Sequence, residues 1–398
     1  MGKIYKDFRN ILYTLALVAC LAPLSVARGS YAPNQPGDSD SINEIWPGPS
    51  WVPASPEAMG MDPTRLAEAR EYALTSGGSG MITRRGVLVM SWGSITETYD
   101  LKSAGKSIGL TALGLAMQDG LMNLGDKAQK YHPEIGLPPD SNLATGWLDD
   151  ITIQHLATMS AGFGKNGGYT ELLFPPGTGW AYSDGGPNWL GESMTLLYQE
   201  DLYTLLTRRV FTPLGIPSNQ LSWRDNFYRP TTIAGIKNRE LGGISASVDA
   251  MARLGLLYLR GGRWAGGQQL LSPAFVQAAG SRQNQLVGLP VTNPAIYPKG
   301  SEHYGLFWWN NADGSMPNVP KDAYWAWGLH ESLIVVIPSL DIVATRASYR
   351  GWQDVDDQNP WTSDYRFIQP FIEPIAQAAL LPGPYYQDKL WIPLLGAR

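Results

Sequence analysis

The stretch 101-LKSAGKSIGLTALGLAMQDG-120 combines a candidate nucleophile with a buried helix. Its apolar residues fall on nearly every side of the helix, a pattern typical of a helix enclosed in a protein core. Ser103 and Lys106 stand three residues apart near its start, so their side chains share one face. A buried helix that begins at Ser103 would place this serine at the base of a pocket and not on an outer surface.

Ser103 and Lys106 could act as a nucleophile and its base, but their spacing alone does not show that they do. A lysine accepts the proton of a serine only when it is neutral, which requires burial or a nearby positive charge. The start of a helix adds N–H groups and a partial positive charge that favour a developing oxyanion. However, Ser-x-x-Lys occurs often by chance. Two interpretations therefore stay open, a catalytic dyad and two unrelated residues.

Composition and charge exclude several classes of protein. The chain has 398 residues, enough for one large domain or two ordinary ones. A net charge of -5 without a long basic run argues against nucleic acid as a partner. The only cysteine is Cys20, and His132, His155 and His303 do not have the spacing of metal ligands. We therefore expect neither a metal nor a cofactor.

The N-terminus predicts export. A basic start precedes an apolar run from Ile11 to Ala27, and small residues end it, so residues 1–27 have the layout of a signal peptide. The run is short for a membrane span, which needs about 20 residues. The segment before Cys20 resembles a lipobox, which leaves a lipidated, membrane-attached form as the alternative. We favour plain export to the periplasm or outside the cell, because the apolar run continues past Cys20.

The order of predicted elements gives the fold class. Residues 28–50 are rich in Pro, Gly, Ser and Asp and are expected to be a linker, so the domain spans 51–398. Strand patterns occur near both ends of this domain, and mostly helical patterns lie between them. This order predicts an α+β fold, with an antiparallel sheet built from both chain ends, flanking helices and an inserted, mostly helical region. The strands are expected at 86–93, 305–311, 331–338 and 340–348, the last two as a hairpin turned at Pro338-Ser339. The helices are expected at 63–76 after an Asp62 cap, at 242–262 with a cap at Ser247, and at 366–381.

Two later segments add candidates for a site. Tyr182 lies in a Gly-rich loop, and a phenol can act as a general acid or base when a cation such as Lys106 stabilises its anion. The alternative is a loop tyrosine packed on Trp180 and Trp189. Trp327-Gly328 precedes a predicted strand, and a glycine there would allow close approach of a ligand to the backbone.

The succession of these segments resembles the serine beta-lactamase-related hydrolases, which include class C beta-lactamases, DD-peptidases and serine esterases. The resemblance is carried by Ser103-Ala104-Gly105-Lys106, by LATMSAGFG, by AYSDGG and by the terminal VIPSLDIV hairpin, over about Trp51 to Ile375. It implies a beta-lactamase/transpeptidase-like fold and a secreted serine hydrolase that acts through an acyl-enzyme. It further implies that Ser103 is the nucleophile, Lys106 its base and Tyr182 the proton relay. The oxyanion hole would be the backbone N–H groups of Ser103 and His330.

Two departures from the family pattern bear on the substrate. Asp184 replaces the asparagine of Tyr-x-Asn, and pairing with Lys106 would raise the pKa of that lysine, which works against Lys106 as a neutral base. A protonated Asp184 or a larger role for Tyr182 would resolve this conflict. Trp327-Gly328 stands where the family has Lys-Thr-Gly, whose lysine binds a substrate carboxylate. Asp184, Trp327 and Gly328 are thus expected to bind substrate. The side chain of His330 is either a cation near the substrate or a polar residue at the end of a strand with no role in the site.

These features predict a small-molecule ester or amide as the substrate. A beta-lactamase or a DD-peptidase is the first alternative. A catalytically inactive binding protein of the cell envelope with the same fold is the second, and Asp184 is the feature that keeps it open.

Overall fold

A computed structural model describes residues 44–353 and 361–379 of the chain. Its first long helix is α1 (Pro63–Leu74), and the predicted cap is confirmed, because the Asp62 side chain accepts a hydrogen bond from the Thr64 N–H. Pro63 suits the first turn, where its missing N–H leaves no bond unmade. Residues 44–50, expected in the linker, already contact the domain. Trp46 packs on Trp264 with ring centroids 5.0 Å apart, so packing begins before Trp51.

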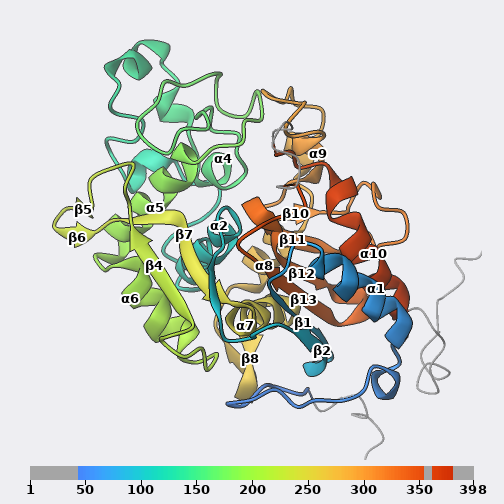
Figure 1. Cartoon of the computed structure of the whole chain (residues 1–398). Coiled ribbons are helices and arrows are strands. Elements are labelled where there is room, and N and C mark those ends of the chain that lie inside the picture. Colours follow the sequence, from blue (N-terminus) through green and yellow to red (C-terminus); the bar gives the residue numbers. More distant parts are fainter. Residues whose placement is uncertain (1–43, 354–360, 380–398) are drawn as a thin grey trace, which may run out of the picture. The chain divides into compact units, whose positions relative to one another are not determined.

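The main sheet joins the two ends of the sequence, as predicted. It has six antiparallel strands in the order β10-β11-β12-β13-β1-β2 (Figure 1). β1, from the start of the domain, pairs with β13, from its end, so Ser79 lies opposite Ala347. The β12–β13 hairpin turns at Pro338–Leu340, which confirms the predicted turn. The strands are β1 (Ser79–Arg84), β2 (Val87–Trp92), β10 (Trp309–Asn310), β11 (Tyr324–Gly328), β12 (Ser332–Ile337) and β13 (Ile342–Ala347).

The region inserted between β2 and β10 holds more strand than predicted. It contains a three-stranded sheet beside its helices, in the order β3 (Thr98–Asp100), β7 and β4 (Leu221–Asp225). The helix expected at 242–262 is wrong in its first part, because Arg239–Ser247 is strand β7 and helix α7 (Val248–Leu259) starts after it. The cap itself is confirmed, since the Ser247 side chain accepts a hydrogen bond from the Ala250 N–H. The apolar residues of β7 continue into those of α7, so the pattern alone did not show the boundary.

The strand expected at 305–311 is also shorter than predicted. Only Trp309–Asn310 is strand, because Phe307 takes a left-handed backbone (φ 54) and its N–H bonds to the Ala157 carbonyl. The other elements are β3 (Thr98–Asp100), α2 (Ala104–Gly109), α3 (Thr111–Gln118), α4 (Ile153–Ala157), α5 (Gly185–Tyr198), α6 (Leu202–Leu206), β4 (Leu221–Asp225), β5 (Thr232–Ile233), β6 (Ile236–Lys237), β8 (Arg263–Trp264), β9 (Gln268–Gln269), α8 (Pro273–Gly280), α9 (Gly300–His303) and α10 (Gln369–Ala378).

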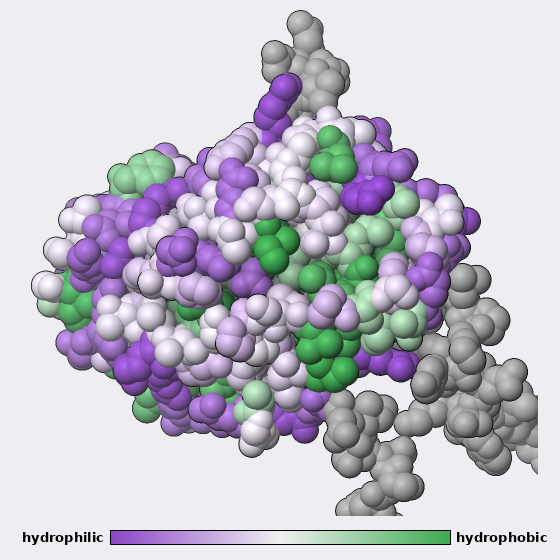
Figure 2. All heavy atoms as spheres, turned by 60° about the horizontal axis from the view of Figure 1, so that its bottom comes forward, coloured by the Kyte–Doolittle hydropathy of each residue, from purple (hydrophilic) through white to green (hydrophobic). Residues whose placement is uncertain are grey.

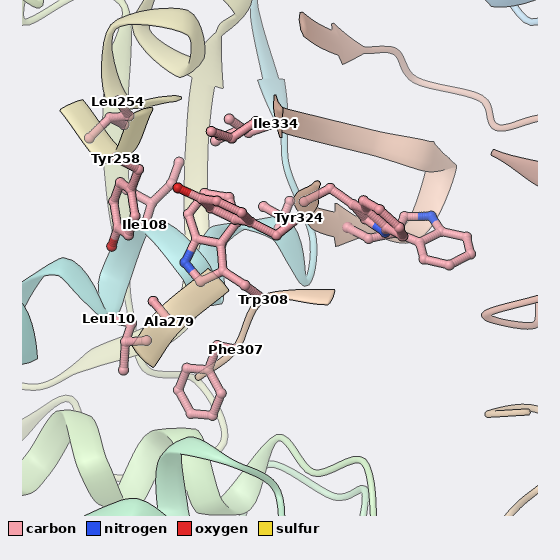
Figure 3. Packing of buried hydrophobic residues seen from close by; sticks show 14 of the residues in the cluster. Ile108, Leu110, Leu254, Tyr258, Ala279, Phe307, Trp308, Tyr324 and Ile334 are labelled. Carbon is pink, nitrogen blue, oxygen red and sulfur yellow. The ribbon is translucent and has the colours of Figure 1, made fainter. Parts of the chain in front are cut away.

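Helix α2 is held between β7 and a core of large side chains. A Cβ added to Gly105 would lie 2.5 Å from the Gly242 carbonyl oxygen, and one on Gly109 would lie 2.6 Å from that of Leu241. These two glycines, one turn apart, therefore let the helix backbone rest directly on β7. On another side, Ile108 points into the cluster around Trp308 and Tyr258, whose rings are 4.7 Å apart (Figure 3). The helix that begins at Ser103 is thus buried, as predicted.

On the face shown in Figure 2, apolar residues lie among polar and neutral ones, and several of them are close together on its right-hand side. Within the described residues, no helix is both long and apolar enough to cross a membrane. The segment expected to be a signal peptide, including Cys20, lies outside the described residues.

Candidate active site

Ser103 and Lys106 form a hydrogen-bonded pair at the base of a cavity of about 440 Å³. Ser103 directly precedes α2, with helical backbone angles, and Lys106 follows one turn later. The Lys106 Nζ donates to the Ser103 Oγ over 2.8 Å. Lys106 is only 4% exposed, whereas Ser103 is half-buried and open to the cavity. The geometry required of a nucleophile beside its base is therefore present.

Tyr182 completes the group on the opposite wall. Lys106 Nζ lies 3.4 Å from the Tyr182 hydroxyl oxygen. The ring of Tyr182 is stacked on Tyr297 at 4.8 Å and nearly parallel to Trp309 at 6.1 Å, while Tyr304 meets it edge-on. These aromatic contacts hold the phenol in one orientation. The alternative of a loop tyrosine packed on Trp180 and Trp189 accounts for only part of this environment, since Tyr182 also faces the cavity.

Asp184 pairs with Lys106, as its position after Tyr182 predicted. The Lys106 Nζ lies 2.6 Å from Asp184 Oδ1, and Lys165 binds the other oxygen, Oδ2. Burial by itself lowers the pKa of Lys106, but the Asp184 carboxylate and Tyr182 outweigh it and hold this pKa above its ordinary value. Burial raises the pKa of Asp184, yet Lys106 and Lys165 together keep it below its ordinary value. The charged pair is favoured, which argues against a protonated Asp184.

Lys165 lines the cavity and pairs with Asp184, but the sequence did not reveal it. It lies in the loop before Tyr182, and backbone folding brings it back to Asp184. The Asp184 N–H bonds to the Lys165 carbonyl at 3.3 Å, and the Ser183 hydroxyl donates to the Gly164 carbonyl at 2.8 Å. A lone lysine in an irregular loop carries no periodic signal, so only its place beside the cavity identifies it.

The end of β11 meets the start of α2 at Ser103. A Cβ added to Gly328 would lie 3.1 Å from the Ser103 nitrogen and 2.1 Å from the Leu101 carbonyl oxygen. Only glycine therefore fits here, because the backbone of Leu101 and Ser103 takes the space beside it. Gly328 is not among the residues that line the cavity, and its expected contact with substrate stays a prediction. Gly328 lies against the backbone of Ser103, and the next residue, Leu329, lines the cavity.

Trp327 does not lie where a substrate contact was expected. Its side chain is 2% exposed and packs edge-on against Trp309 and Trp361 at 5.9 and 5.3 Å. Side chains alternate along β11, so Trp327 points to the same side as Trp325, toward Tyr365 in the core. The expectation of a substrate contact is corrected. Trp327 supports the cavity wall from behind.

His330 lies just beyond, in a left-handed conformation with φ 65. Its carbonyl accepts a hydrogen bond from Arg346, and its side chain is not among those that line the cavity. The role of its backbone N–H in an oxyanion hole stays a prediction.

The remaining cavity wall has a charged part and an apolar part. Lys102 pairs with Asp100 at 2.8 Å, and Arg224 pairs with Glu240 at 2.7 Å and with Asp100 at 3.2 Å. The apolar part is formed by Tyr228, Ile296, Tyr297, Leu329 and Trp361. Every cation that lines this cavity thus has a carboxylate partner. In the described part of the chain, no three His, Cys, Asp or Glu residues are grouped so as to hold a metal ion.

Comparison with known proteins shows the family of this chain. The beta-lactamase family model matches residues 70–360, which is most of the chain. This chain belongs to the beta-lactamase family. The solved structures that resemble this family member include a beta-lactamase from Mycobacterium bovis, with 18% identity, a TM-score of 0.56 and coverage of 78% of this chain and 98% of that one.

Two further structures widen the range of relatives. EstCE1, a hydrolase with promiscuous acyltransferase activity, has 17% identity and a TM-score of 0.56 over 79% of this chain and 97% of its own. Unliganded simvastatin synthase from Aspergillus terreus has 15% identity and a TM-score of 0.57 over 82% and 99%. At these identities the likeness establishes the beta-lactamase/transpeptidase-like fold alone, which was predicted. A search of curated protein sequences found no significant match.

Proposed function

We propose that this protein is a serine hydrolase that forms an acyl-enzyme at Ser103 and acts on neutral esters or small amides. The observation that carries the proposal is the 2.8 Å hydrogen bond between Lys106 Nζ and Ser103 Oγ at the base of a cavity. Members of the beta-lactamase family are serine hydrolases, which supports this chemistry.

The reaction would proceed in two steps. The Ser103 Oγ attacks the carbonyl carbon and gives its proton to Lys106, while backbone N–H groups where α2 begins stabilise the oxyanion. The tetrahedral intermediate then expels the alcohol or amine, which takes a proton from Lys106 or through Tyr182, 3.4 Å away. Water next attacks the acyl group and releases the acid, which restores the Ser103 hydroxyl.

Asp184 sets the condition for the first step. Lys106 accepts a proton only in its neutral form, and the adjacent carboxylate favours the charged form. We therefore expect the acylation rate to increase as the pH rises and Lys106 loses its proton.

The pairing of charges in the cavity favours neutral substrates. Lys102, Arg224 and Lys106 each have a carboxylate within 3 Å. A substrate carboxylate would have to displace one of these partners. EstCE1, a hydrolase with promiscuous acyltransferase activity, shares this fold, which supports acyl transfer as the class of reaction.

A beta-lactamase is the second candidate, and one observation favours it. Asp184 is shared by two lysines, and Lys165 is 54% exposed beside the cavity. One positive charge is therefore in excess there, and it could receive the carboxylate of a beta-lactam.

Turnover of short- and long-chain nitrophenyl esters beside nitrocefin tests the proposal. We expect the esters to be hydrolysed faster than nitrocefin, and Ser103→Ala to abolish both reactions. Faster turnover of nitrocefin would favour the beta-lactamase. Absence of turnover of either substrate by the folded wild-type protein, at neutral and alkaline pH, would favour the inactive binding protein.

A further inference from the structure

The turn that follows β11 has an unusual backbone. His330 and Glu331 are consecutive residues with left-handed φ angles of 65 and 48, and neither is glycine. Side chains with a Cβ disfavour this conformation, so two in succession persist only where the surroundings hold them. Gly328, two residues earlier, lies against the Ser103 backbone, which places this strained turn next to the nucleophile.

Arg346 on β13 holds the turn from inside the core. Its side chain is fully buried, and its guanidinium donates to the carbonyls of both His330 and Glu331, the latter at 3.0 Å. It also donates to the Ser76 hydroxyl and to the Arg350 carbonyl, and it lies 4.6 Å from the Trp352 ring. A buried guanidinium is costly unless its donors are satisfied. Two of its acceptors are the carbonyls of the strained residues.

The Glu331 side chain fixes the turn from the other side. Its carboxylate is fully buried and accepts hydrogen bonds from the Trp352 N–H at 2.5 Å and the Gln353 side chain at 2.9 Å. Gln353 in turn exchanges two hydrogen bonds with the backbone of Thr362, next to Trp361 in the cavity wall. A Cβ on Gly351 would lie 2.1 Å from the Glu331 carboxylate, so this segment closes tightly over the turn.

We propose that Arg346 and Glu331 are positioning residues for catalysis. They fix the Leu329–Glu331 turn after β11, so that the backbone N–H expected in the oxyanion hole, that of His330, faces the substrate carbonyl oxygen at Ser103. The inference rests on the proposed acyl-enzyme mechanism. Neither side chain lines the cavity, so their effect passes through the backbone. An oxyanion donor displaced by a fraction of an ångström weakens the transition state more than the bound substrate.

Arg346→Lys and Glu331→Gln test the inference in the whole chain. Lysine keeps the charge but cannot reach two carbonyls with a planar fork, and glutamine keeps the shape without the charge. Arg253→Lys is the matched control, since Arg253 is equally buried and donates to Asp249 and to the Leu214 carbonyl at 2.9 Å, with neither the turn nor the cavity among its contacts. The concentration of reactive sites is first measured by exhaustive fluorophosphonate labelling. Each kcat is then calculated per labelled site, so that unfolded protein does not lower it.

For Arg346→Lys and Glu331→Gln we expect kcat per labelled site on a nitrophenyl ester to fall about 10- to 100-fold, with KM changed less than about threefold. An arylboronic acid, which places an oxygen where the oxyanion forms, should bind more weakly by a similar factor. Arg253→Lys should keep both values. The inference is overturned if kcat per site and boronate affinity stay at wild-type values in Glu331→Gln or in Arg346→Lys. It is also overturned if Arg253→Lys loses as much as they do. Failure of the proposed function is a separate result, in which the wild-type protein neither turns over the ester nor is labelled.

Discussion

At the scale of single residues, Asp184 is the side chain with the strongest effect on the charge of Lys106 beside Ser103. A carboxylate 2.6 Å from Lys106 keeps that lysine charged, whereas an asparagine at this position would leave burial as the main influence on it. The sequence predicted this pair, because Asp184 follows Tyr182 at the spacing of a family motif. It did not predict Lys165, which reaches the same carboxylate only because the loop folds back.

Asp184→Asn should move the acidic limb of the pH–activity profile to lower pH. Removing the carboxylate takes away the charge that raises the pKa of Lys106, and burial then lowers it, so the neutral amine is present at lower pH. We expect a shift of about one pH unit or more, and hence roughly tenfold faster ester turnover at neutral pH. The measurement is kcat/KM against pH for the two proteins. An unchanged acidic limb would mean that Lys106 does not act as the base.

Lys165→Gln supplies a control of opposite sign. Without Lys165, the Asp184 carboxylate interacts with Lys106 alone, so the pKa of Lys106 should rise and the acidic limb should move to higher pH. Because Lys165 is 54% exposed, the shift should stay under about half a pH unit. A shift toward lower pH would contradict the charge arrangement described for this site.

At the scale of elements, the placement of α2 against β7 sets the position of Ser103. The burial of this helix was predictable, since its apolar residues cover all sides. The caps at Asp62 and Ser247 were predictable because each depends on one side chain that bonds to an N–H two or three residues later. Strand β7 was not, because its apolar residues run on into α7 and its partner β3 lies far away in the sequence.

Gly109→Ala should destabilise the fold through this contact. The added Cβ would lie 2.6 Å from the Leu241 carbonyl oxygen, a backbone atom that cannot move without displacing β7. We expect the free energy of unfolding to fall by about 1–3 kcal/mol in urea denaturation. Gly191→Ala, on α5, is the control. Its Cβ would meet the Leu241 side chain at an ordinary 3.5 Å, so helix propensity should leave stability unchanged or raise it by up to about 1 kcal/mol. Equal losses in the two variants would contradict the tight α2–β7 contact.

At the scale of the whole molecule, the sheet joins strands from both ends of the described domain. This topology was predictable from the order of strand and helix patterns, since no alternation of strand and crossover helix was present. The direction in which Trp327 points was not. The position of a residue in a motif predicts the strand that it occupies, but not the direction of its side chain. The ring of Trp327 lies in the core because it packs against Trp309 and Trp361.

Export remains a proposal at this scale. If residues 1–27 are a signal peptide, the protein recovered from the periplasm or medium of an expressing bacterium should begin at Arg28. Cys20→Ser should leave its mass and location unchanged, and intact-mass spectrometry measures this. A lipidated fragment that begins at Cys20, lost in Cys20→Ser, would instead establish the lipoprotein alternative.

The central claim is that Ser103 is the nucleophile. Its most direct test is intact-mass and peptide analysis of the protein after reaction with a fluorophosphonate, beside Ser103→Ala and under identical conditions. We predict one added group per chain, located on Ser103, and none in the variant. A stoichiometric label that persists in Ser103→Ala, or a folded wild-type protein that stays unlabelled at neutral and alkaline pH, would contradict the account.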